Sequence, residues 1–200
     1  QVTGTISSTL LAFGGVNLIS VVNPPPGGGT SNFITVNVSA LAPVNDNFVN
    51  ATPVASSPFS NTVDNSGATP EGADPAPSCA SGSPGSNLRA KSVWYRFTPN
   101  GDGSVTADTI GSTYDTILTV ITGNPPGTQV ACDDDSAGNF NSRVSFSATS
   151  GTTYNFMISA FQDPLAPPWL ANGGKTVFNL TANLTVPPYT LATPTGQQTV

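Results

Sequence analysis

Three consecutive acids, Asp133, Asp134 and Asp135, are the residues of this 200-residue chain best suited to do chemistry. Adjacent carboxylates repel one another unless water solvates the loop or a hard cation lies among the oxygens. Carboxylate oxygens are preferred ligands of Ca²⁺, so the run predicts a calcium site. The same side chains also suit turns, because Asp accepts hydrogen bonds from nearby backbone amides. Both interpretations stay open from the sequence.

Three further acids stand beside asparagines or at a predicted strand end, namely Asp46, Asp64 and Asp115. They supply additional oxygen ligands if the loops of one domain meet at the same end. The spacing does not match an EF-hand, which requires alternating acids followed by glycine. Capping of turns is again the alternative for each residue.

The composition argues against an enzyme and against nucleic acid as a partner. The chain has no His, so a hydroxyl nucleophile lacks the commonest activating base, and no Ser-x-x-Lys motif replaces it. Glycoside hydrolysis needs a carboxyl group with a raised pKa opposite a second carboxylate, which a solvated acidic run seldom provides. Five Lys and Arg against eleven Asp and Glu leave no basic stripe for phosphates.

Two cysteines, Cys79 and Cys132, lie in loop-like surroundings rich in Gly, Ser, Pro and Asp. An oxidising compartment favours a disulfide between them across a long loop, and two free thiols are the alternative. The chain contains no run of eighteen apolar residues, so its sequence predicts no membrane-spanning helix. Because Gln1 is not an initiator Met, a removed leader or an excised segment is expected. The pattern of strands and turns together with the cysteine pair indicates a secreted, extracellular or cell-surface location.

Alternating apolar residues predict β-strands in the middle of the chain. Val93, Tyr95 and Phe97 share one face, residues 117–121 are apolar or Thr on both faces, and residues 154–158 alternate again. With 20 Gly and 19 Pro as turn formers, the pattern indicates an all-β fold, an antiparallel β-sandwich of the jelly-roll or immunoglobulin-like kind.

The first 42 residues predict an incomplete immunoglobulin-like β-segment. Residues 5–13, 16–22 and 33–41 are strand-like, and the run Asn23–Asn32, with three Pro and three Gly, predicts a turn. This run resembles the closing part of an IPT/TIG domain, although the opening strands of that family are missing. Three strands are too few to bury a core, so a partner strand is expected.

Residues 43–186 resemble the bacterial pre-peptidase C-terminal-like (PPC) domain, a calcium-associated β-sandwich that accompanies secreted enzymes and surface proteins. The segments that carry the resemblance are Asn45–Phe48, Val63–Asn65, Ser92–Phe97, Tyr114–Thr116, Cys132–Asp135, Ser142–Phe146 and Gly151–Tyr154. The resemblance implies a sandwich and a calcium site, both consistent with the residue patterns. Residues 187–200 form a Thr-rich and Gln-rich tail that predicts a strand-forming segment or a linker.

Exposed aromatic residues and glycosylation sequons are the remaining candidates for contact with sugars. Trp94 alternates within a strong strand and is expected to pack, whereas Trp169 is expected to cover the sandwich or contact a partner. Four sequons occur, at Asn37, Asn50, Asn179 and Asn183. Strand alternation turns three of them to solvent, those at Asn37, Asn179 and Asn183. Glycosylation is one interpretation, and chance matches in a chain rich in Asn and Thr are the other.

Two functions compete on this basis. The first is an extracellular structural protein, the protomer of a surface filament or multi-module adhesin, assembled by strand complementation between the N-terminal and C-terminal segments of neighbouring copies. The second is a Ca²⁺-stabilised module that binds a carbohydrate or another polymer for a secreted enzyme.

Overall fold

A computed structural model describes residues 15–23, 26–38, 40–81, 87–162, 165 and 173–186. The strand predicted at residues 5–13, Trp169 and the tail at 187–200 lie outside the described residues. The regular secondary structure of the described part consists of β-strands and one short 3₁₀ helix, η1 (Phe48–Asn50). None of its helices is long and apolar enough to cross a membrane.

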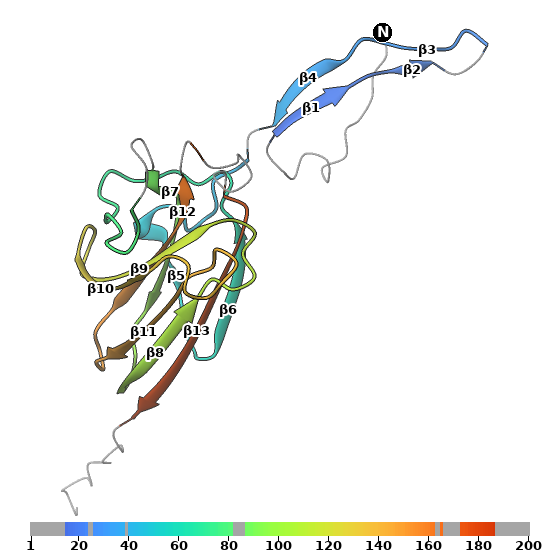
Figure 1. Cartoon of the computed structure of the whole chain (residues 1–200). Coiled ribbons are helices and arrows are strands. Elements are labelled where there is room, and N and C mark those ends of the chain that lie inside the picture. Colours follow the sequence, from blue (N-terminus) through green and yellow to red (C-terminus); the bar gives the residue numbers. More distant parts are fainter. Residues whose placement is uncertain are drawn as a thin grey trace, which may run out of the picture.

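Two sheets pack face to face as a sandwich (Figure 1). The five-stranded sheet has the order β10 (Thr128–Asp133), β9 (Thr116–Thr122), β12 (Tyr154–Gln162), β7 (Asn87–Phe97) and β5 (Thr52–Pro53). The four-stranded sheet has the order β11 (Arg143–Ala148), β8 (Asp102–Asp108), β13 (Lys175–Thr185) and β6 (Phe59–Asp64). Every pairing is antiparallel except that of β5 with β7, which is parallel. The predicted all-β antiparallel sandwich is confirmed.

The main core lies between the sheets and is built from the alternating residues. Tyr95 of β7 and Phe178 of β13 stack across the two sheets with ring centroids 4.3 Å apart. Phe156 of β12 adds a tilted contact to Phe178 at 5.3 Å. All three side chains are fully buried, which follows from the period of two in each strand.

A second, smaller core covers the outer face of the five-stranded sheet. Trp94 is fully buried there with Ile121 and Met157, so the expectation that Trp94 packs is confirmed. The ring of Phe48 in η1 meets Trp94 edge to face at 5.2 Å. The segment around η1 therefore acts as a cover, and β9 and β12 are buried on both faces because both faces are covered.

A long hairpin precedes the sandwich and stands apart from it in Figure 1. Its arms are β1 (Gly15–Ile19) with β2 (Val22–Asn23) and β3 (Gly29–Thr30) with β4 (Ile34–Val38). Within the described ranges these strands pair only with one another. The turn at the Pro-rich and Gly-rich run is where the sequence predicts it.

Candidate cation-binding site

Three acidic side chains meet where β9 begins and β10 ends. Asp115 immediately precedes β9, and Asp134 and Asp135 immediately follow β10. Antiparallel pairing of these strands, with Asp133 opposite Leu118, brings the two ends together. Each of the three carboxylates offers one oxygen, and these oxygens all lie within 4.8 Å of one another. We call these three residues the carboxylate cluster.

The backbone around Asp115 is fixed by two neighbouring elements. The amide of Phe161 in β12 donates to the carbonyl of Asp115 at 2.9 Å. The amide of the next residue, Thr116, donates to the carbonyl of Phe140 at 3.0 Å. The loop after β10 therefore folds back against the start of β9, and the position of Asp115 does not depend on its own side chain.

Two oxygens of the carboxylate cluster are buried without a partner. Asp115 and Asp134 each have one oxygen, Oδ1, that is buried and receives no hydrogen bond from the described residues. Asn141, which is only 6% exposed and follows Phe140, also has an unpartnered buried Oδ1. A buried oxygen that receives no hydrogen bond costs free energy of folding. These oxygens therefore indicate a ligand that accepts their lone pairs, such as a cation.

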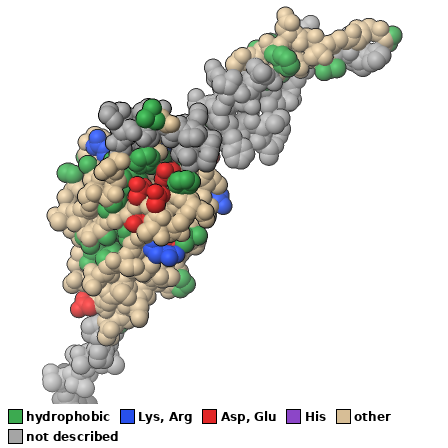
Figure 2. Space-filling model, in the orientation of Figure 1, with side chains coloured by type: hydrophobic (Ala, Val, Ile, Leu, Met, Phe, Trp, Pro, Cys, Tyr) green, Lys and Arg blue, Asp and Glu red, His purple; other side chains and the backbone are tan. Residues whose placement is uncertain are grey.

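The electrostatics of the carboxylate cluster disfavour three negative charges. Burial, and then the charges of Asp134 and Asp135, raise the pKa of Asp115 to about 7. Burial, followed by the charges of Asp135 and Asp133, raises the pKa of Asp134 to about 6. Because both shifts come from desolvation and like charge, a cation between the oxygens would relieve them. On the face of the sandwich seen in Figure 2, several acidic side chains gather in one group, and another lies apart from it near the lower end of the sandwich.

This donor set suits a hard divalent cation. Ca²⁺ takes about six to eight oxygen ligands from carboxylates, carbonyls and water, in flexible geometry. The carboxylate cluster supplies three carboxylates, and backbone carbonyls or water would supply the remaining ligands. Soft metals prefer thiolate and imidazole, and the chain has no His while its two cysteines are bonded to each other.

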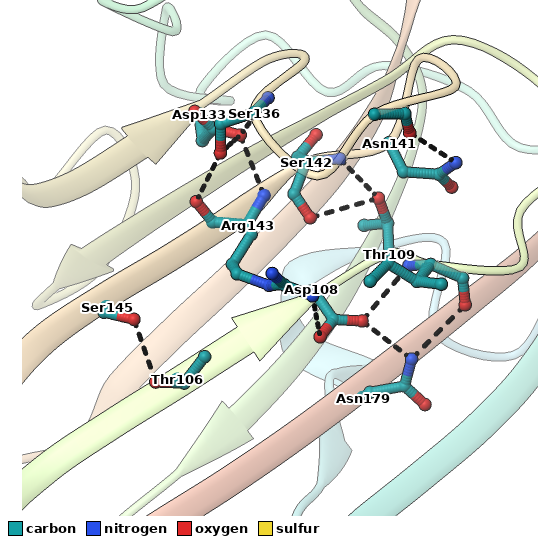
Figure 3. A network of polar contacts seen from close by, with 12 residues as sticks. Thr106, Asp108, Thr109, Asp133, Ser136, Asn141, Ser142, Arg143, Ser145 and Asn179 are labelled. Atoms are coloured by element: carbon teal, nitrogen blue, oxygen red, sulfur yellow. Dashed lines mark hydrogen bonds and ion pairs between the residues drawn. The ribbon is translucent and has the colours of Figure 1, made fainter.

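Asp133 does not join the cluster, although the sequence predicts a ligand role for it. Its Oδ2 accepts hydrogen bonds from the amide of Ser136 at 3.1 Å, from the Ser136 hydroxyl at 2.8 Å and from the amide of Arg143 at 2.8 Å (Figure 3). It therefore caps the turn after β10. An Asp three residues before a Ser is a local sequence signal for such a cap. This signal distinguishes the role of Asp133 from that of Asp134 and Asp135.

Asp46 and Asp64 are caps as well, each away from the cluster. Asp46 is buried and accepts from the amide of Thr69 at 2.7 Å and from its hydroxyl at 3.1 Å, which ties two parts of the cover together. Asp64 accepts from the amide of Ser66 at 2.9 Å. Of the six predicted ligands, the structure brings together Asp115, Asp134 and Asp135. Asn141 lies between Phe140 and Ser142, which both bond to Thr116, and its own side-chain amide donates to the carbonyls of Gly138 and Asn139.

The sequons differ in accessibility. Asn50 and Asn183 are exposed, whereas the side chain of Asn37 lies outside the described set. Asn179 faces outward, but its amide nitrogen donates to Asp108 at 2.8 Å and its carbonyl oxygen accepts from Ser60 at 2.8 Å. Figure 3 shows Asn179 beside the Asp108 carboxylate, which also pairs with Arg143 at 3.7 Å. Glycosylation of Asn179 would require breaking these bonds.

The predicted disulfide between Cys79 and Cys132 is formed, with the two Cα atoms 5.5 Å apart. Cys132 is the second-last residue of β10, so the cross-link lies two residues from Asp134. It closes a long loop, with 53 positions separating the two residues. The loop that contains Cys79, between β6 and β7, is thereby attached to β10.

Comparisons with known proteins give no family for the chain. No family model matches it, and no curated protein matches it. Among solved structures, the periplasmic g-type lysozyme inhibitor PliG of Aeromonas hydrophila is 11% identical, with a TM-score of 0.38 over 66% of this chain and 96% of that chain. A likeness at this TM-score carries no argument about function. The resemblances to IPT/TIG and PPC domains stay predictions.

Proposed function

We propose that this chain is a non-catalytic, extracellular structural module whose β-sandwich is stabilised by a bound divalent cation, calcium. The carboxylate cluster carries this proposal, because three carboxylates meet with two buried oxygens that receive no hydrogen bond from the described residues. The disulfide supports an oxidising compartment outside the cytoplasm. The absence of His from the sequence supports a non-catalytic role.

Calcium titration tests this proposal directly. We expect isothermal titration calorimetry to give one site with a dissociation constant of about 10⁻⁴ to 10⁻³ M, as in extracellular modules. The double variant Asp115→Asn, Asp134→Asn should weaken binding at least about tenfold, because two charged ligands are lost. Asp64→Asn, which removes one charge from a cap outside the cluster, should bind as the wild type does. Absence of binding by the wild type at 10 mM Ca²⁺, about ten times the weakest expected constant, would disprove the proposal.

A second candidate function, self-assembly, rests on the N-terminal hairpin. Val22, Phe33 and Ile34 are 69%, 65% and 68% exposed, so this two-stranded sheet presents apolar side chains to solvent. A two-stranded hairpin is marginally stable in water, and its edges offer backbone groups to another strand. Addition of a strand from a second copy would cover the apolar side chains and pair the backbone groups at the edges. If each copy adds a strand to the next and the contacts do not close into a ring, a fibre results.

The predicted contribution of the tail at 187–200 lies outside the described residues and stays a prediction, as does binding of glycans. Hairpin-mediated assembly nevertheless gives a measurable outcome, because the apolar side chains can be replaced without touching the sandwich.

We expect the double variant Phe33→Ser, Ile34→Ser to abolish self-association of the full chain. Light scattering after gel filtration, together with negative-stain microscopy in Ca²⁺, should give oligomers or fibres for the wild type and monomers for the variant. Val49→Ser is the matched control, because Val49 is 77% exposed but lies in η1 on the sandwich. A wild type that stays monomeric at all concentrations would exclude this second function for the chain.

A further inference from the structure

The last residues of β10 connect the disulfide to the carboxylate cluster. Cys132 and Asp133 end the strand, and Asp134 and Asp135 follow without interruption. β10 is an edge strand, so among the described strands it pairs only with β9, and this pairing has an irregularity at Val130. The position of its end therefore depends strongly on what else holds it.

The stretch Ser78–Cys79 holds two side chains of β10, those of Gln129 and Cys132, while Asp133 is held by Ser136 and Arg143. The amide of Ser78 donates to the Gln129 side chain at 3.2 Å, and the Gln129 amide group donates to the Ser78 hydroxyl. The amide of Cys79 donates to the sulfur of Cys132 at 3.3 Å, beside the disulfide itself. These attachments all come from two consecutive residues, so cleavage of the disulfide removes the covalent one and loosens the others.

We propose that the Cys79–Cys132 disulfide sets the cation affinity of the carboxylate cluster, so that reduction by a dithiol weakens binding. This inference rests on the proposed function, because it concerns regulation of the same site. Cation binding requires Asp134 and Asp135 to be held near Asp115. The oxidised protein has them held before binding by both the disulfide and the Asp133 cap, whereas the reduced protein keeps only the cap and must order more of the end of β10 when the cation binds.

The sulfur of Cys79 belongs to an exposed residue, so a reductant can reach it, while Cys132 is half-buried. A thiolate of the dithiol attacks the Cys79 sulfur and breaks the S–S bond, which releases the Cys132 thiolate. The second thiol of the reductant then displaces Cys79. Two electrons and two protons pass to the protein, giving two thiols, and the dithiol becomes a cyclic disulfide.

Thermodynamic linkage makes the effect reciprocal. If the disulfide strengthens cation binding by a given factor, the cation favours the disulfide over the two thiols by the same factor. We expect a factor of about ten, within the usual range of coupling between two sites. Calcium should therefore also shift the equilibrium with a dithiol toward the intact disulfide.

The first experiment is calcium titration of the full chain by calorimetry, comparing the oxidised protein with the Cys79→Ser, Cys132→Ser variant. We expect the variant to bind about tenfold more weakly. Phe59→Ala controls for general loss of stability, because Phe59 packs in β6 of the other sheet and should keep the wild-type affinity. Equal affinity of oxidised protein and cysteine variant would overturn this inference and leave the proposed function standing. Failure of the oxidised protein to bind would overturn both.

The second experiment does not depend on folding of the cysteine variant. The wild-type disulfide is brought to equilibrium with mixtures of reduced and oxidised dithiothreitol, with Ca²⁺ and with chelator at one pH, and the free thiols are counted. We expect the equilibrium constant for disulfide formation to be about tenfold higher in Ca²⁺. The variant Asp115→Asn, Asp134→Asn should show no such difference. A calcium effect of equal size in that variant, or none in the wild type, would overturn the inference.

Discussion

Replacing Phe178 with alanine is expected to lower the free energy of unfolding by about 3–5 kcal/mol, the usual cost of truncating a fully buried aromatic residue. Phe178 contacts rings from three other strands, Phe59 at 6.2 Å, Tyr95 at 4.3 Å and Phe156 at 5.3 Å. No neighbour can fill the space without breaking these contacts. Urea unfolding followed by the fluorescence of the tryptophans, in buffer with constant Ca²⁺, measures the loss.

The matched control is Ile110→Ala, at a position that is 41% exposed. Exposed sites of this kind usually change stability by less than about 0.5 kcal/mol. Phe178→Leu should be milder than the alanine variant, because more of the volume is kept. A loss below about 1 kcal/mol for Phe178→Ala would mean that the two sheets do not share the core described here.

Without divalent cations, the protein is expected to lose stability as the pH rises from about 4 to about 7. The carboxyl group of Asp115 has its pKa raised to about 7 by burial and then by Asp134 and Asp135. An unfolded aspartate titrates near pH 4, so the folded state binds the proton more tightly. Protonation therefore stabilises the fold below about pH 4, and that stabilisation is lost as the pH rises through about 7. Asp134, with its pKa raised to about 6, acts in the same direction.

Thermal unfolding of protein freed of divalent cations by dialysis, at pH 5 and pH 8, measures this effect. The midpoint should be a few degrees lower at pH 8, and added Ca²⁺ at pH 8 should restore it. Asp115→Asn, Asp134→Asn should remove most of the pH dependence and raise the cation-free midpoint at pH 8. Asp64→Asn should behave as the wild type, since it lies outside the cluster. A higher midpoint at pH 8 than at pH 5 in the cation-free wild type would contradict the raised pKa values.

The strands were predictable because the alternation of apolar and polar residues along each strand follows the alternation of buried and exposed side chains. In β13 the apolar residues Phe178 and Leu180 are buried while Thr181 and Asn183 are exposed, as the period of two requires. Trp94 was predictable as a packed residue, but not the cover that buries it. That cover, around η1, has little periodicity and is held by side-chain caps such as Asp46 to Thr69.

The candidate site was predictable only as a set of acids. Asp115 and Asp134 are separated by two strands, and the register of β9 against β10 decides that they meet. The sequence carries no direct signal for that register, so ligands and caps look alike within the run of three acids. Asp133 and Asp134 are adjacent in the chain and have opposite roles, because only one of them faces donors in the turn.

The position of β13 between β8 and β6 determines when this domain can fold. β13 is the last described strand, yet it forms the middle of the four-stranded sheet and pairs with both neighbours. During synthesis, β6 and β8 have no partner between them until residues 175–185 emerge. The pairing of β6 with β13 joins residues more than one hundred positions apart, and such distant contacts slow folding. A nascent or truncated chain that lacks β13 would expose two open edges in place of one completed sheet, so folding and protection from aggregation should both begin only with this strand.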